Sequence, residues 1–193
     1  MIDAGFGTKE NLLLQLQQHN EQALAVLMKT HYKDMYNYAS RFASDEALVK
    51  DAIQEVFISL WQRRETATSI LSLPYYLLGA VKNRVLKALQ KNKNNYGTVQ
   101  DSAHYHFEVE FSIEKKITEK QFADERAGNV RSIISHLSPR QREIIYLKFY
   151  QQLDHDQIAG LMNISQQSAY NLLHESIQKF KKNWQSKFLM KAC

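Results

Sequence analysis

Apolar residues recur at intervals of three and four along much of the chain, a spacing that predicts amphipathic helices rather than strands. Residues 8–30 have this spacing, with a break expected near His19–Asn20, and residues 31–43 continue it. The clearest helix covers residues 45–64, where Ser44 or Asp45 is expected to cap the N-terminus. Its apolar stripe is broad, and a second face carries Asp51, Gln54, Glu55 and Ile58.

A further helix is predicted for residues 74–91, after a polar and β-branched loop at Glu65–Ser72. Pro74 suits the first turn, since its missing N–H has no partner there. Aromatic rings stack on unpaired bases and basic side chains bind phosphates, so this helix is a candidate surface for single-stranded nucleic acid. An equally open interpretation places both tyrosines in the core. The candidates are Tyr75, Tyr76, Lys82, Asn83, Arg84 and Lys87, with Lys91 beyond them.

A second helical domain is predicted from about residue 131. Ser138 and Gln141 have the spacing of a capping box around Pro139, and Asp154 and Gln157 repeat it. The helix between the two boxes is expected to bury Ile144, Ile145, Leu147 and Phe149. Residues 92–105 contain little that could form a core, and residues 106–130 are acidic and partly helical in pattern.

Residues 154–176 have the spacing of a helix-turn-helix motif. Ala159 is small enough for two helices to touch, Asn163 tolerates the positive φ of the turn, and Ser165 can cap the second helix. Ala169 and Leu172 are expected to point inward. The alternative is an ordinary helical hairpin with a polar face. Base edges and phosphates would be contacted by Ser165, Gln166, Gln167, Ser168, Tyr170, Asn171 and His174, with Lys179, Lys181 and Lys182 on the DNA backbone.

Composition supports an all-α fold of two small helical domains joined by a flexible linker. The 193 residues are 44% hydrophobic and include only 6 Gly and 2 Pro. The expected domains are residues 1–93, an acidic linker at 94–130, and the helix-turn-helix domain at 131–193. Residues 1–95 hold 12 basic and 9 acidic side chains, residues 96–130 hold 4 and 7, and residues 131–193 hold 9 and 4. Two basic blocks thus flank an acidic strip, which favours a polyanionic partner, although a solvated lysine surface would look the same.

Catalytic and metal-binding functions are not predicted. Cys193 is the single cysteine, and His104 and His106 lack the carboxylate-histidine spacing of a zinc enzyme. We find no phosphate-binding glycine loop and no nucleophile elbow. We therefore expect no enzyme activity, no cofactor, no metal and no small-molecule substrate. With no signal or membrane-spanning pattern, the expected location is the cytoplasm.

Two blocks of sequence resemble the extracytoplasmic-function (ECF) sigma factors of the sigma-70 family. One is Asp51-Ala-Ile-Gln-Glu-Val-Phe-Ile-Ser-Leu-Trp61 with Tyr76-Leu-Leu-Gly-Ala-Val-Lys-Asn-Arg84. The other is Leu137-Ser-Pro-Arg-Gln-Arg-Glu-Ile144 with the helix-turn-helix segment. The likeness covers roughly residues 20–93 and 131–183, in the family's order and spacing.

The resemblance implies a sigma factor that directs core RNA polymerase to promoters and assists promoter melting. Asp51, Gln54, Glu55 and Ile58 would bind the polymerase clamp helices, and the loop at about Thr66–Leu73 would capture a flipped base of the −10 element. Tyr75, Tyr76, Lys82, Asn83, Arg84 and Lys87 would hold the melted strand. The helix from Ser165 to Lys179 would read the −35 element, and nearby residues would dock on the polymerase flap.

Three positions depart from the family pattern and concern promoter sequence more than function. Lys87 stands where the family usually has Asp, Asn163 replaces a turn Gly, and Ser168-Ala169-Tyr170 replaces a Thr-Val-Lys-like run. Tyr-Asn at this point resembles sigma factors of the Bacteroidetes group, which implies an anti-sigma partner, often membrane-anchored. The alternative function is a conventional helix-turn-helix regulator, which would leave residues 45–91 without a role. A helical adaptor without DNA affinity is a third hypothesis.

Overall fold

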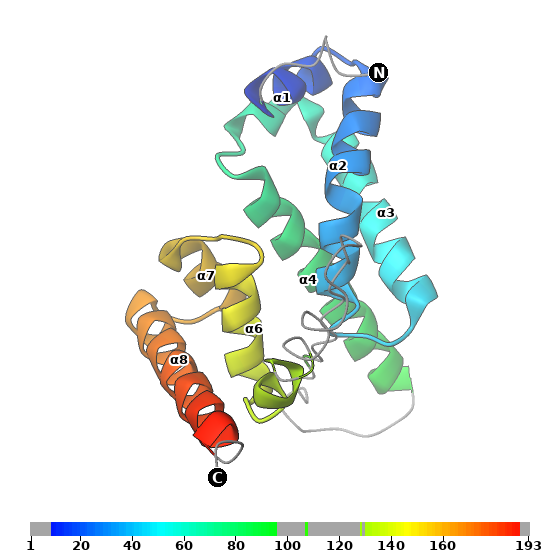
Figure 1. Cartoon of the computed structure of the whole chain (residues 1–193). Coiled ribbons are helices and arrows are strands. Elements are labelled where there is room, and N and C mark those ends of the chain that lie inside the picture. The colour runs from blue at the N-terminus through cyan, green and yellow to red at the C-terminus, as the bar shows by residue number, and fades with distance from the viewer. Residues whose placement is uncertain (1–8, 96–106, 108–127, 129, 190–193) are drawn as a thin grey trace, which may run out of the picture. The chain divides into compact units, whose positions relative to one another are not determined.

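The chain folds into helices, shown in the computed structural model of Figure 1, which describes residues 9–95, 107, 128 and 130–189. No strand occurs among these residues, so the predicted all-α class is confirmed. The chain divides into two compact units, residues 1–102 and 103–193. The division falls inside the predicted linker at 94–130.

The N-terminal unit is built on three mutually packed helices: α2 (Glu21–Ala39), α3 (Glu46–Gln62) and α4 (Leu73–Asn95). A shorter helix, α1 (Lys9–Gln17), packs on the 3-10 helix η1 (Arg64–Ser69) that joins α3 to α4. The core between the three long helices is apolar and closed to solvent, which is the main source of this unit's stability. Its fully buried side chains include Leu27, Tyr38, Ile53, Phe57, Leu77 and Val81.

Local signals set the helix ends of this unit. His19 has a φ of 63°, and the Asn20 side chain accepts a hydrogen bond from the Gln22 N–H, so the predicted break at His19–Asn20 is confirmed. Of the two candidate caps for α3, Asp45 is the one used, since its carboxylate accepts from the N–H groups of Ala47 and Leu48.

The predicted loop at Glu65–Ser72 is in large part the 3-10 helix η1. Short polar side chains make this tight turn possible, because they bond to nearby carbonyls: Thr66 Oγ1 donates to Arg63 O at 3.1 Å, and Ser69 Oγ donates to Thr66 O at 2.7 Å. Ala67 is the one residue of η1 with a buried side chain. The segment is therefore ordered with very little apolar core of its own.

A polar contact ties α2 to the first turn of α3. Tyr36 Oη donates to Glu46 Oε1 at 2.8 Å, and Lys50 Nζ pairs with Glu46 Oε2 at 3.2 Å. The hydrogen bond from Tyr36, and after it Lys50, lowers the pKa of Glu46 below the ordinary 4.5, and the same bond raises the pKa of Tyr36. Because the folded pKa of Glu46 is lowered, the contact stabilises the fold above pH 4.5 and is lost as pH falls through the lowered value.

Tyr36→Phe is expected to move the pKa of Glu46 back toward 4.5, because the largest cause of its lowering is removed. An NMR titration of the Glu46 carboxyl carbon measures this. The matched control is Tyr32→Phe: Tyr32 stacks on Tyr36 with ring centroids 6.3 Å apart and retains that stacking as phenylalanine. An unchanged Glu46 pKa in Tyr36→Phe would contradict the assignment.

The C-terminal unit contains α6 (Pro139–Phe149), α7 (His155–Met162) and α8 (Gln166–Leu189), preceded by helical residues 130–134. α8 packs on both α6 and α7. Both predicted capping boxes are confirmed. Gln141 N–H donates to Ser138 Oγ at 3.3 Å, and Gln157 N–H donates to Asp154 Oδ1 at 2.8 Å, each with the reciprocal bond from the cap N–H.

Two expectations about this core are corrected. Ile144, Ile145 and Leu147 are buried as predicted, but Phe149 is 58% exposed. Two residues turn a helix by about 200°, so Phe149 lies roughly opposite Leu147. Leu172 is only half-buried, and Leu173, one turn after Ala169, points into the core instead.

Phe107 is a core residue of the C-terminal unit, although its position falls in the predicted linker. Its side chain is fully buried, and its ring centroid lies 5.9 Å from that of Tyr146 on α6. A buried phenylalanine contributes roughly 1.5–3 kcal/mol of transfer free energy. The C-terminal core therefore includes a residue from well before the predicted domain start at 131.

Candidate nucleic-acid and protein interfaces

One face of α3 is exposed and carries all four residues predicted to bind a protein partner. Asp51, Gln54, Glu55 and Ile58 follow the i, i+3, i+4, i+7 spacing of a single helix face, and each is exposed. Ile58 is 47% exposed although it is a large aliphatic residue. An exposed apolar side chain within an acidic helix face fits a protein partner with basic residues around an apolar contact.

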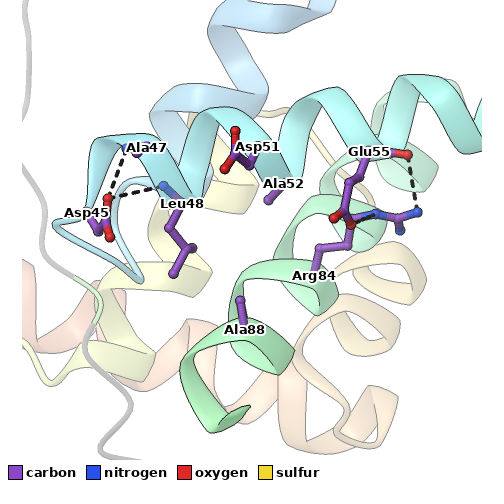
Figure 2. Close-up of a pocket in the computed structure, with 8 residues that line it drawn as sticks. All are labelled: Asp45, Ala47, Leu48, Asp51, Ala52, Glu55, Arg84 and Ala88. Atoms are coloured by element: carbon purple, nitrogen blue, oxygen red, sulfur yellow. Dashed lines mark hydrogen bonds and ion pairs between the residues drawn. The ribbon is translucent and has the colours of Figure 1, made fainter. Parts of the chain in front are cut away.

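This face borders a pocket of about 370 Å³ between α3 and α4, shown in Figure 2. The pocket has three carboxylates, from Asp45, Asp51 and Glu55, and one cation, from Arg84. Its remaining lining residues are Ala47, Leu48, Ala52 and Ala88. Because carboxylates dominate, the pocket suits a basic side chain of a partner rather than a phosphate.

Arg84, predicted to contact DNA, is bound to the α3 face instead of projecting freely from α4. Its Nε lies 3.2 Å from Glu55 Oε2, its Nη2 donates to the Glu55 carbonyl at 3.2 Å, and Nη2 also donates to Ser59 Oγ. The predicted polymerase-binding residue Glu55 and the predicted strand-binding residue Arg84 are therefore one connected group. A substitution at either residue changes the surroundings of the other.

The other candidate residues of α4 are divided between surface and core. Asn83 and Lys87 are exposed, and Tyr75 and Tyr76 are half-buried. Lys82 was expected on the solvent side, but only 6% of it is exposed, and its Nζ lies 5.4 Å from the centroid of the Phe42 ring. The long aliphatic stem of lysine can follow an apolar surface, and here the ammonium group is placed over an aromatic face.

The helix-turn-helix geometry predicted for the C-terminal unit is present. Asn163 has a φ of 51°, its N–H donates to Gly160 O at 3.3 Å, and the Ile164 N–H donates to Ala159 O at 3.1 Å. These two bonds form a Schellman C-cap of α7. Ala159 is 4% exposed, and Ser165 Oγ accepts from the Ser168 N–H at 3.1 Å at the start of α8. The turn, the small contact residue and the cap are thus confirmed.

The polar face of α8 is solvent-exposed over two turns and then becomes basic. The Gln167 and Asn171 amides are hydrogen-bonded to each other at 2.9 Å, and Tyr170 is 58% exposed, with its ring centroid 6.1 Å from that of His155. Two linked amides on one helix face suit the edge of an adenine in the major groove. All the predicted contact residues are exposed: Ser165, Gln166, Gln167, Ser168, Tyr170, Asn171, His174, Lys179, Lys181 and Lys182.

The left-handed turn at Asn163 is a sensitive point of the motif. We expect Asn163→Gly to leave stability unchanged or slightly raised, and Asn163→Val to cost about 1–3 kcal/mol, because a β-branched residue is strained at positive φ. Urea unfolding of the full chain measures both. His174→Val, on the exposed face of α8, controls for the helix propensity of valine. Equal unfolding midpoints for the two valine variants would show that the turn carries no strain.

Membrane-spanning and metal-binding features are absent from the part of the chain that the structure describes. Over these residues, no helix is long and apolar enough to cross a membrane. The same residues hold no group of three or more His, Cys, Asp or Glu side chains arranged to bind a metal ion. His104 and His106 lie outside the described residues.

A helix-turn-helix unit with a basic extension, together with a helical unit that presents an acidic face, defines a DNA-binding protein that also docks on another protein. Comparison of the sequence with models of protein families identifies the class of protein. Residues 27–95 match the model of Sigma-70 region 2, and residues 127–180 match that of Sigma-70, region 4. The matches span 69 and 54 residues, well over half of the 193. The chain belongs to the sigma-70 family, whose members bind core RNA polymerase and promoter DNA in transcription initiation.

Solved structures show the same fold at low sequence identity. CnrH, solved in complex with the cytosolic domain of CnrY, is 15% identical with a TM-score of 0.55, over 90% of this chain and 94% of that one. The sigma factor RpoE, solved with the anti-sigma factor NepR from Bartonella quintana, is 12% identical with a TM-score of 0.55, over 82% of this chain and 94% of that one. Among curated protein sequences, none matches the chain.

Proposed function

We propose that the chain is an ECF-type sigma factor that places core RNA polymerase on promoters with separate −10 and −35 elements and holds the melted strand. The observation that carries the proposal is the pairing of region 2 and region 4 in one chain, with only residues 96–126 between the two matches. The chain performs no bond chemistry of its own, and its expected location is the cytoplasm.

The N-terminal domain, proposed at residues 1–93 and containing most of the region 2 match at 27–95, would supply both the polymerase contact and the −10 contact. Asp51, Gln54 and Ile58 would meet the clamp helices directly, and Glu55 would do so while paired with Arg84. The loop at Thr66–Leu73 would accept a flipped base, which costs a few kcal/mol in lost stacking. The exposed side chains of Asn83 and Lys87 would contact the strand, together with Tyr75 and Tyr76, which are half-buried. Lys82 does not present its ammonium group in this conformation, so we assign it no direct contact.

Region 4, at residues 131–193, would read the −35 element with the exposed face of α8 and dock on the polymerase flap. Each small domain alone binds DNA weakly. Attachment of both to one polymerase makes the second contact intramolecular, at an effective concentration up to the millimolar range. Residues 94–130, apart from Phe107 in the C-terminal core, would serve as the acidic connection between them.

An anti-sigma factor is the further partner that we propose. CnrH and RpoE were both solved with a second protein bound, and RpoE's partner is an anti-sigma factor. The acidic α3 face with Ile58 is the surface most suited to it here, because a protein bound there would block the polymerase contact. The Tyr170-Asn171 pair supports an origin in the Bacteroidetes group and a membrane-anchored anti-sigma factor.

Run-off transcription tests the proposal. The purified chain is added to core RNA polymerase on genomic fragments, and the transcript ends are mapped. Specific starts that depend on the chain, each preceded by two spaced sequence elements, are the expected result. A conventional helix-turn-helix regulator would give no such starts and would not be retained by immobilised core polymerase.

A further inference from the structure

Helix α1 and the turn that follows it lie outside the region 2 match, which begins at residue 27, yet they contact the proposed base-capture loop. α1 packs directly on η1. The Gln17 side chain donates from Nε2 to the Glu65 carbonyl at 2.9 Å. This bond joins the last residue of α1 to the backbone of η1, 48 positions further along the chain.

Arg64, the first residue of η1, is held from two sides. Its Nε donates to His19 Nδ1 at 2.9 Å, its Nη1 donates to the Trp61 carbonyl at 2.9 Å, and its guanidinium carbon lies 4.8 Å from the centroid of the Trp61 ring. A guanidinium group is planar with fixed donor directions, so these contacts define its orientation closely. Arg64 thereby joins the end of α3, the start of η1 and the α1–α2 turn.

The position of η1 depends on such contacts because its own core is so small. Only Ala67 among its six residues has a buried side chain, and Leu71 just beyond it is 98% exposed. A segment with few apolar contacts opens locally at low free-energy cost unless polar contacts hold it. Two long-range side-chain hydrogen bonds connect η1 to the α1–α2 segment: Gln17 donates to the Glu65 carbonyl, and His19 accepts from Arg64.

We infer that Arg64 is a positioning residue for −10 strand capture, and that the α1–α2 turn, through His19, is the support that orders the loop in advance. The inference rests on the proposed function, since it assumes that residues 66–73 receive an unstacked base. A loop ordered before binding loses less conformational entropy when it takes up the strand. Arg64 acts through the loop and needs no contact with DNA.

Matched variants of the full chain, assembled with core polymerase, test the inference. Arg64→Gln removes the guanidinium group, and His19→Ala removes its acceptor. His19→Asn places Oδ1 where Nδ1 was and tolerates positive φ, so it should restore binding. Arg63→Gln is the control, because Arg63 is adjacent and exposed and loses the same charge. The probe is a single-stranded −10 oligonucleotide whose sequence comes from mapped transcript starts.

Arg64→Gln and His19→Ala should bind the oligonucleotide at least about fivefold more weakly, the effect of losing one charge-assisted hydrogen bond. Their affinity for core polymerase should stay within about twofold of the unsubstituted chain. Amide hydrogen exchange should accelerate in residues 64–70, with no change at α2. Arg63→Gln and His19→Asn should bind the oligonucleotide like the unsubstituted chain.

The outcomes separate the two proposals. If the unsubstituted holoenzyme does not prefer the single strand, the proposed function itself fails. If it does, and Arg64→Gln binds the strand as tightly as Arg63→Gln, the positioning role is overturned. An equal loss of core affinity and strand affinity would also overturn it, because that pattern belongs to general damage at the end of α3.

Discussion

Asp51→Lys is expected to weaken association with core RNA polymerase more than tenfold and to abolish chain-dependent transcription starts. Asp51 lies on the exposed α3 face between the other two carboxylates, Asp45 and Glu55, as Figure 2 shows. It is one turn before Glu55 and two turns before Ile58. Reversal of a charge at the centre of an acidic surface replaces attraction with repulsion, and like charges across an interface cost several kcal/mol. Tenfold corresponds to about 1.4 kcal/mol, so the expected effect exceeds that threshold comfortably.

Asp51 is a better position for this test than Glu55. Glu55 is ion-paired with Arg84, so its substitution would disturb the strand-binding surface along with the polymerase contact. The structure shows no hydrogen bond or ion pair of the Asp51 carboxylate among the described residues, and its replacement should leave the melting temperature nearly unchanged.

Asp34→Lys provides the matched control, since Asp34 is an exposed carboxylate that belongs to α2 and is not one of the residues of the proposed α3 face. Titration of immobilised core polymerase with each variant gives the affinities. Comparable affinities for Asp51→Lys and Asp34→Lys would mean that the acidic face of α3 is not the polymerase contact. If both variants lost affinity to the same extent, the net charge of the chain, rather than this surface, would govern association.

The parts of the fold that sequence predicted correctly depend on neighbouring residues. Asp45, Ser138 and Asp154 were expected as caps because their side chains bond to N–H groups two or three residues ahead. Asn163 was expected at positive φ for a similarly local reason, and the i, i+3, i+4, i+7 spacing from Asp51 to Ile58 predicted a shared exposed face. All these expectations are confirmed, because nothing distant in the chain competes with them.

The parts that sequence missed depend on contacts between distant segments. Arg84 was read as a free cation on α4, and it pairs with Glu55, 29 positions earlier. Lys82 was read as exposed, and it extends over Phe42. A helical wheel assigns charged residues to solvent and does not include an aromatic ring or a carboxylate supplied by another helix.

Phe107 shows the same limit most clearly. It lies in the acidic stretch at residues 106–130, which was assigned to the linker, and yet it is fully buried beside Tyr146. The available signal was an alternation of apolar and acidic residues, in which Phe107, Val109 and Phe111 are separated by single glutamates. The α1–η1 contact was equally out of reach, because it joins Gln17 and His19 to residues more than 40 positions away.

The second large effect is expected at the recognition face of α8. Gln167→Ala combined with Asn171→Ala should lower holoenzyme affinity for a promoter with its native −35 element by about tenfold or more. The two amides are already hydrogen-bonded to each other, so they form one preorganised donor–acceptor group. Each single substitution should therefore cause most of the affinity loss that the double variant shows. Affinity for a promoter with a scrambled −35 element should barely change, since only base reading is removed.

Salt dependence distinguishes base reading from phosphate contact on this same helix. Each phosphate contact adds about 0.9 to the slope of log affinity against log salt concentration, whereas contacts to base edges add almost nothing. The double amide variant should therefore keep the slope of the unsubstituted chain and lose −35 specificity.

Lys179→Gln should lower the slope by about one and weaken binding to both promoters alike. Gln185→Ala, about 21 Å along α8 from Asn171, controls for amide loss in general. If the double variant lost affinity equally for native and scrambled elements, the exposed face of α8 would not be the surface that reads the −35 element. The role of region 4 in this chain would then rest on the polymerase contact alone.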